Sequence, residues 1–213
     1  MKILQIFLVA ALCAVATITV SSCDDDYGPI KENTNELTGE EKAAVLNALQ
    51  GTYNGITTSK NGAAKVTWRI EGDQLIIDKF PLRFLGPVAG GVYHNAFTNK
   101  DSVTVLNATI SPFKPSKNVS SNTAFFYLTP DGHGRKYEVP FTVTINGKTC
   151  QGILHFVSSS YEGIYASAGT MDMKGNMQFM FVVESFDVFL DNTVTPQTIN
   201  CNNFVISFQY NKL

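Results

Sequence analysis

The chain has 213 residues, with 16 basic and 18 acidic side chains and a formal net charge of −2. This length corresponds to one domain or two small ones. A slightly negative net charge does not indicate the basic surface that nucleic-acid binding requires. Charged residues make up 16% of the sequence, below the ~25% of an ordinary soluble domain.

Residues 1–22 have the layout of a secretory signal peptide. Lys2 is followed by a long apolar run without charge, and a positive start, an apolar run and small residues mark such a signal. The run ends in VSSC at Cys23, which resembles the lipobox of bacterial lipoproteins. The resemblance implies cleavage before Cys23, a diacylglycerol on its thiol and a fatty acid such as palmitate on its amine. The other interpretation is an ordinary cleaved signal with a chance cysteine.

Three acidic residues, Asp24, Asp25 and Asp26, follow Cys23 directly. A short acidic run in this place resembles the export signal of surface lipoproteins in Bacteroidetes-type bacteria. The resemblance implies an outer-membrane protein that is held by its lipid and exposed on the cell surface. The alternative is a solvated spacer. Residues 23–37 would form an acidic and polar tether, and residues 38–213 a single β-rich domain with an N-terminal helix.

A helix is predicted to begin at Thr38. Thr38 and Glu41 form a T-x-x-E capping box, in which each side chain accepts a backbone N–H of the other. The sequence after this helix, LQGTYNGITT, resembles the opening of lipocalin and other calycin barrels, with Tyr53 in the place where Trp is usual. Together with the N-terminal features, the chain resembles uncharacterised Bacteroidetes surface lipoproteins, whose domains have no known function.

Strands are predicted for most of the remaining chain. KVTWRI alternates apolar and polar residues, as expected for a half-buried antiparallel strand. Asn146-Gly147 suits a two-residue hairpin turn, so Val143 should face Cys150 and His155 should point away from the core. A further hairpin is predicted around Lys174–Asn176. About ten strands without parallel crossovers predict an all-β fold, either an antiparallel, calycin-like barrel or a β-sandwich.

Three long loops are predicted, at residues 81–100, 111–121 and 191–203. Connections commonly have about 4–6 residues, and the first loop mixes glycines with large apolar side chains. Tyr93 and Phe97 should therefore either cover the core or line the mouth of a ligand site at the open end of the β-structure.

Two cysteines remain after Cys13 leaves with the signal and Cys23 takes lipid. An exported protein can join Cys150 and Cys201 in one disulfide. The alternative is two buried thiols. Asp101-Ser102-Val103 matches a short signal for O-glycosylation in Bacteroidetes proteins, which marks Ser102, although this residue also suits the start of a strand.

Sequence motifs for catalysis are missing. No nucleophile elbow, zinc-protease motif, phosphate-binding glycine loop or paired-cysteine motif is present. His94, His133 and His155 are scattered, and the methionines of residues 171–180 suit a core as well as copper. We therefore expect no enzyme, metal or cofactor.

Two functions remain open. The first is a non-catalytic binding module for a small apolar ligand or a glycan. The second is a structural or accessory subunit that docks on a surface protein partner.

Overall fold

The computed structural model describes residues 37–98, 104–114, 123–132, 134–158, 160–161, 164–165, 167–190 and 195–212. Cys23, Asp24, Asp25, Asp26 and Ser102 lie outside these ranges, so their predicted roles remain predictions. Within the described ranges, no helix is long and apolar enough to cross a bilayer.

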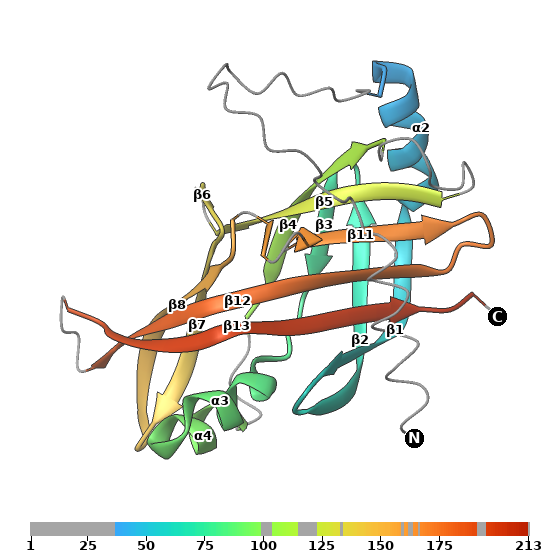
Figure 1. Ribbon diagram of the computed structural model, residues 1–213. Coiled ribbons are helices and arrows are strands. Elements are labelled where there is room, and N and C mark those ends of the chain that lie inside the picture. The colour runs from blue at the N-terminus through green and yellow to red at the C-terminus, as the bar shows by residue number, and fades with distance from the viewer. Residues whose placement is uncertain are drawn as a thin grey trace, which may run out of the picture.

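Short helices and many strands form the described chain (Figure 1). The helical segments are α2 (Gly39–Leu49), η1 (Leu82–Leu85), α3 (Gly86–Ala89) and α4 (Gly91–Thr98). The first strands are β1 (Gly51–Ser59), β2 (Gly62–Glu71), β3 (Gln74–Ile77), β4 (Leu106–Phe113), β5 (Thr123–Gly132) and β6 (Arg135–Lys136). The later strands are β7 (Glu138–Ile145), β8 (Lys148–Phe156), β9 (Ser160–Tyr161), β10 (Ile164–Tyr165), β11 (Ser167–Asp172), β12 (Met177–Phe189) and β13 (Gln197–Tyr210).

Eight strands close into an antiparallel barrel. The strands from β1 to β5 pair in chain order, and β5 then pairs with β11. β11 pairs with β12, β12 with β13, and β13 with β1, which closes the barrel. The predicted all-β barrel is confirmed, and the barrel rather than the sandwich is formed. Because closure pairs the two outermost strands, it removes the open edges that an exposed sheet would present.

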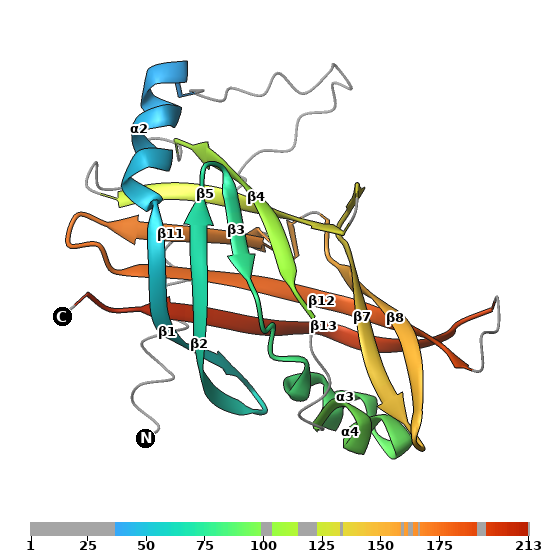
Figure 2. The ribbon, with the colours of Figure 1, turned by 180° about the vertical axis from the view of Figure 1, so that it is seen from behind.

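In chain order, a hairpin of β7 and β8 comes between β5 and β11. It pairs with β12 and so extends the wall of the barrel. β12 pairs with β11 along its first half and with β8 along its second half, with a β-bulge between Val183 and Ser185. Figure 2 shows this hairpin beside the far ends of β12 and β13. β12 is therefore one long strand that continues through the bulge to Phe189, and β13 already begins inside the predicted third loop.

The hairpin of β7 and β8 has the predicted register. Val143 faces Cys150, and Asn146 and Gly147 have φ values of 50° and 78°, as a type I′ turn requires. Leu154 is fully buried, whereas the side chain of His155 is 26% exposed on the opposite face. Local alternation and turn chemistry were sufficient to predict this part of the fold.

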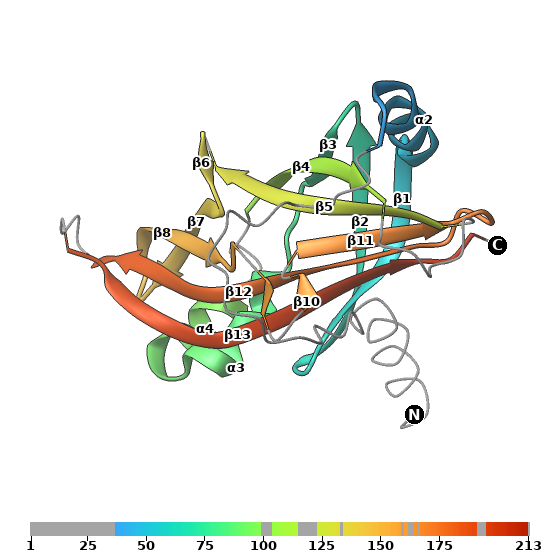
Figure 3. The same ribbon diagram turned by 45° about the horizontal axis from the view of Figure 1, so that its top comes forward.

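Helix α2 begins with the predicted capping box. The Thr38 N–H donates to Glu41 Oε2 at 2.8 Å, and the Glu41 N–H donates to Thr38 Oγ1 at 3.2 Å. The Tyr53 hydroxyl donates to the Leu49 carbonyl at 2.7 Å and joins the end of the helix to β1. Figure 3 shows α2 above the ends of β1 and β2, and α3 and α4 beneath the far halves of β12 and β13.

Aromatic rings fill the barrel around Trp68. Phe179 and Phe208 stack with ring centres 4.7 Å apart, and Trp68 meets Phe179 edge-on at 5.1 Å. Gly55 makes room for the indole, because an added Cβ would lie 2.4 Å from Trp68 Cη2 and 2.4 Å from the Gln209 carbonyl oxygen. The apolar core is therefore built from rings on one face of β2, β12 and β13.

Three buried polar atoms in this region have no hydrogen-bond partner among the described residues. They are Thr57 Oγ1, Trp68 Nε1 and Ser167 Oγ. Thr57 and Ser167 pair across strands with Phe208 and Phe181, whose side chains belong to the core. A buried hydroxyl that loses its water and gains no partner costs stability, so the Thr57 hydroxyl lowers the free energy of unfolding.

The predicted loop of residues 81–100 is helical where it is described. Tyr93 and Phe97 of α4 are 6% and 1% exposed. Phe97 lies 4.9 Å from Phe186 and 5.5 Å from Phe141, measured between ring centres. The segment forms helices because its large apolar side chains can then face one way, toward the sheet of β7, β8 and β12.

Candidate functional site

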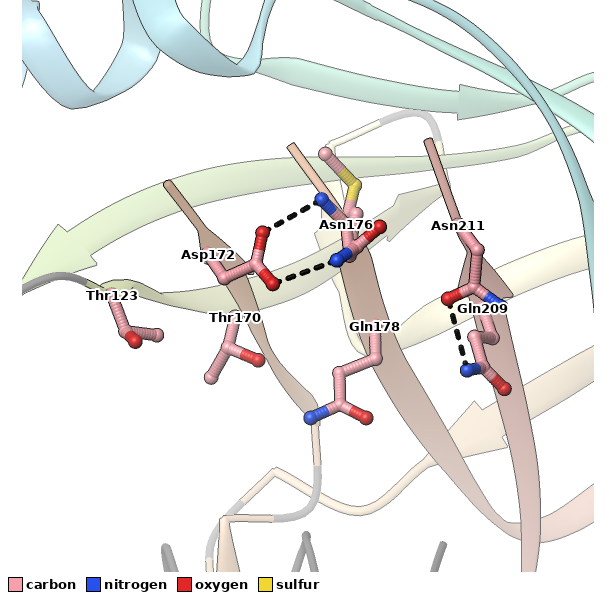
Figure 4. A pocket seen from close by; sticks show the side chains of 8 residues that line it. Thr123, Thr170, Asp172, Asn176, Gln178, Gln209 and Asn211 are labelled. Carbon is pink, nitrogen blue, oxygen red and sulfur yellow. Dashed lines mark hydrogen bonds between the residues drawn. The ribbon is translucent and has the colours of Figure 1, made fainter. Parts of the chain in front are cut away.

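A polar pocket of about 250 Å³ lies on the outer wall of the barrel, where the β11–β12 turn meets the end of β13. Its lining is rich in amides and hydroxyls (Figure 4). The lining residues are Thr123, Thr170, Asp172, Asn176, Met177, Gln178, Gln209 and Asn211. Such groups both donate and accept hydrogen bonds, so the pocket suits a ligand with many hydroxyls.

Asp172 organises the turn at one side of this pocket. Its Oδ1 accepts the N–H groups of Lys174 and Asn176, each at 2.9 Å, and its Oδ2 accepts Asn176 Nδ2 at 2.8 Å. Burial raises the pKa of Asp172, but the hydrogen bonds from Asn176 and Lys174 outweigh it and hold the pKa below its ordinary value. The carboxylate is therefore ionised and engaged within the protein.

Asn176 links the same turn to the end of the chain. Its Oδ1 accepts the Lys212 N–H at 2.9 Å. The turn and the segment after β13 therefore support each other, which gives the pocket a fixed rim.

Thr170, Gln178 and Gln209 form the floor of the pocket. Thr170 pairs with Gln178, and Gln178 pairs with Gln209; cross-strand partners point to the same face of a sheet. All three are partly exposed, and Gln209 Nε2 donates to Asn211 Oδ1 at 3.2 Å. Figure 4 shows the side chains of Thr170 and Gln178 extending into one open space. Their remaining hydrogen-bonding groups are available to a ligand.

A second polar cluster lies on the outer face of the inserted hairpin. His155 Nε2 is 2.9 Å from Asp187 Oδ2, and His155 Nδ1 is 4.0 Å from Glu138 Oε1. Thr198 Oγ1 donates to Asp187 Oδ1 at 2.5 Å. The network joins β7, β8, β12 and β13 across their strands.

This cluster differs from a nucleophile–histidine–carboxylate triad. In a triad, the imidazole lies between the nucleophile and the carboxylate, whereas here Asp187 lies between His155 and Thr198. Both nitrogens of His155 face carboxylates, so the imidazole does not contact the hydroxyl of Thr198, which donates to Asp187 instead. The network is suited to holding four strands in register.

The other residues considered for chemistry lie apart. His94 is exposed on α4, and His133 is outside the described residues. Met177 is buried in the core, whereas Met173 is 78% exposed on the turn. No group of three or more His, Cys, Asp or Glu side chains that could hold a metal ion occurs in the described ranges.

The predicted disulfide is absent from the structure, in which Cys150 and Cys201 are free and buried. Cys201 follows Asn200, which pairs with Ser185, and Ser185 pairs with His155 on β8. Cys150 lies five residues from His155 along β8, about 17 Å at the rise of about 3.4 Å per residue. A disulfide needs Cα atoms within about 7 Å, so the alternative of two buried thiols is the correct one.

Tyr93 and Phe97 are located away from the polar pocket. The Tyr93 hydroxyl donates to Gln197 Oε1, and its ring lies 6.2 Å from that of Phe186, measured between centres. Burial, and to a smaller extent Cys150, raises the pKa of Tyr93. In this structure both side chains cover the sheet rather than line the pocket.

No family model matches the chain, and neither a curated protein nor a solved structure matches it. Its function must therefore be argued from the residues themselves. The pocket was not predicted from the sequence, although the outward positions of β11, β12 and β13 provided a signal: GTM, MQF and FQY place Thr170, Gln178 and Gln209 between residues without charge that point to the other face.

Proposed function

We propose that this protein is a lipid-anchored, non-catalytic carbohydrate-binding module of a bacterial cell surface. The observation on which the proposal rests is the pocket of amides and hydroxyls on the outer barrel wall. Sugars present many hydroxyls at fixed spacing, and amide side chains can donate to one hydroxyl while accepting from the next. Thr170, Gln178 and Gln209 would form these bonds.

The barrel interior favours a glycan over a small apolar ligand. Apolar ligands bind in concave sites lined mainly by apolar side chains. Around Trp68, the described interior is occupied by stacked rings, with Phe179 and Phe208 in mutual contact. The polar outer pocket therefore supports the glycan form of the proposal.

A glycan array followed by titration calorimetry tests this function. The double variant Gln178→Ala/Gln209→Ala should bind an array hit at least tenfold more weakly than the unmodified protein, because each hydrogen bond contributes about 1 kcal/mol. Gln151→Ala is the matched control, since Gln151 is an exposed amide on β8. An array without any hit, or equal losses in the two variants, would contradict the proposal.

The anchor is tested separately. When cells are fed a clickable fatty acid, the protein with its original sequence should become labelled, and the Cys23→Ala variant should not. Replacing Asp24, Asp25 and Asp26 by Ala should protect the protein from protease added to intact cells. If the triple variant is cleaved as readily as the unmodified protein, the acidic run is a spacer.

The edge of β7 supports the second candidate function, an accessory subunit of a surface assembly. Among the described strands, β7 pairs with β8 alone. Ile145 and Lys148 flank a two-residue turn and so form a hydrogen-bonded pair, which directs the backbone groups of Thr142 and Thr144 away from β8. An exposed edge of this kind can accept a strand from another protein.

A proline substitution distinguishes this candidate. Thr142→Pro removes one outward N–H and should release a bound surface protein from the purified complex. Sugar binding at the outer pocket should be unchanged. A complex that survives this substitution would exclude the β7 edge as its interface.

A further inference from the structure

The floor of the pocket continues as a row of outward side chains across the barrel wall. Gln209 pairs with Ile56 of β1, and Ile56 pairs with Lys65 of β2. With Thr170 and Gln178, the row crosses five neighbouring strands. At about 4.8 Å between strands, it is about 19 Å long. This is a surface for an extended ligand rather than for a single sugar.

Apolar side chains stand at both sides of the amides. Ile56 is 51% exposed, and Met173 on the β11–β12 turn is 78% exposed. Sugar rings have faces of C–H groups as well as hydroxyl edges, so an exposed aliphatic group beside a pair of amides can contact the ring while the amides bind its hydroxyls. The row therefore offers both kinds of contact that a chain of sugars requires.

The charges around this row are mainly positive. Lys65 ends the row, and Lys174 and Lys212 lie at the turn, where Lys212 packs over Gly175. No ion pair of these three lysines is found among the described residues. Lys174 also acts on Asp172 through its charge, and exposed lysines outside ion pairs can attract an anionic ligand over about a Debye length.

The carboxylates on this wall are already engaged. Asp172 is the one carboxylate among the described lining residues, and it accepts three hydrogen bonds within the turn. Farther along β2 and just after β3, Glu71 and Asp78 pair with Arg69 at 3.0 and 2.5 Å. The lysines therefore remain the charged groups that can act on a ligand.

We propose that the ligand is an acidic polysaccharide that lies across the strands along Thr170, Gln178, Gln209, Ile56 and Lys65. Its carboxylate or sulfate groups would face Lys65 at one end of the row, and Lys174 and Lys212 at the β11–β12 turn beside the other half of the row. This inference rests on the carbohydrate-binding function proposed above and adds the charge and the direction of the chain.

Titration calorimetry of the full-length protein with matched oligosaccharides tests the inference. The probes are polygalacturonate oligosaccharides and their carboxyl-reduced forms, and dextran sulfate oligosaccharides and plain dextran of the same length. We expect at least tenfold tighter binding of one acidic probe than of its neutral form at 50 mM NaCl, and most of this advantage should disappear at 500 mM NaCl because salt screens exposed charges. Which acidic probe binds distinguishes carboxylate from sulfate.

Lysine variants then locate the charged groups. Lys65→Gln and Lys212→Gln should each weaken the binding of the acidic probe about two- to fivefold, as expected for the loss of an exposed ion pair. The binding of the neutral probe should not change. Lys136→Gln on β6 is the control.

Each remaining outcome has a distinct meaning. Equal binding of acidic and neutral probes would overturn the inference and leave the carbohydrate-binding function standing. Binding of neither, together with an array without hits, would overturn both. An effect of Lys136→Gln equal to that of Lys65→Gln would overturn the proposed direction of the chain.

Discussion

The two faces of β12 and β13 differ sharply although their residues alternate along the same strands. On the inner face, Phe179 and Phe208 stack inside the barrel and are 2% and 1% exposed. On the outer face, Gln178 and Gln209 pair across the same two strands and line the polar pocket. Adjacent residues thus belong to the stabilising core and to the candidate binding surface, so stability and binding should respond to different substitutions.

The largest effect is expected on the inner face at Phe208. Phe208→Ala should reduce the free energy of unfolding by about 3–5 kcal/mol, because it removes a buried ring and leaves a cavity. Val205 on the same strand is 41% exposed, and Val205→Ala should change stability by no more than about 0.5 kcal/mol. Urea unfolding of both variants measures the contrast, and similar losses would break the comparison of the two faces.

A nearly equal loss is expected when a side chain is added inside the barrel. Gly55→Ala should destabilise the protein by about 3 kcal/mol, since the new Cβ would meet both the Trp68 ring and a backbone oxygen that cannot move aside. Gly39 in α2 has open space around it, so Gly39→Ala is a suitable control. Thermal unfolding of both variants provides the measurement. A Gly55→Ala protein as stable as the unmodified one would show that the ring packing is loose.

Alkaline pH should weaken the inner face at Cys201. Burial raises the pKa of its thiol to about 12, an effect that Lys60 partly opposes. The folded state therefore resists losing the proton, and its stability falls as pH rises from the unfolded value of about 8.5 toward 12. Between pH 8 and 10, the unmodified protein should lose about 2 kcal/mol more than Cys201→Ala. Parallel losses in urea titrations at the two pH values would indicate that the thiol is accessible to water.

A gain of stability is expected at Thr57. Thr57→Val replaces a buried hydroxyl without a described partner by a methyl group of the same shape, which should add about 1 kcal/mol to the free energy of unfolding. Thr58→Val, at a partly exposed position beside it, should have little effect. A loss of stability in Thr57→Val would show that the hydroxyl has a partner in solution.

The smallest effect on folding is expected at the pocket. Gln178→Ala should change stability by less than about 0.5 kcal/mol while it weakens glycan binding. The neighbouring substitution Phe179→Ala should cost several kcal/mol, because that side chain is buried in the core. Equal losses of stability in this pair would contradict the division of β12 into an inner and an outer face.

Short-range features of this protein were predictable because they depend on neighbouring residues. The Thr38–Glu41 cap and the Asn146-Gly147 turn were both predicted and are both present. The same alternation placed Trp68 inward. By contrast, residues 81–100 have no strict period and were expected to form a loop, whereas their large side chains become buried as helices against the sheet.

The sequence by itself determined the all-β class, the two faces of strands such as β2, and the register of the β7–β8 hairpin, since a turn and a period of two act over a few residues. The tertiary structure alone decided the closure of the barrel, because it depends on β1 meeting β13 and on β11 meeting both β5 and β12. It also decided the separation of Cys150 from Cys201 and the gathering of Thr170, Gln178 and Gln209 into one pocket. These features require distant segments to pair, and neither the spacing of residues nor their type specifies which strands become neighbours.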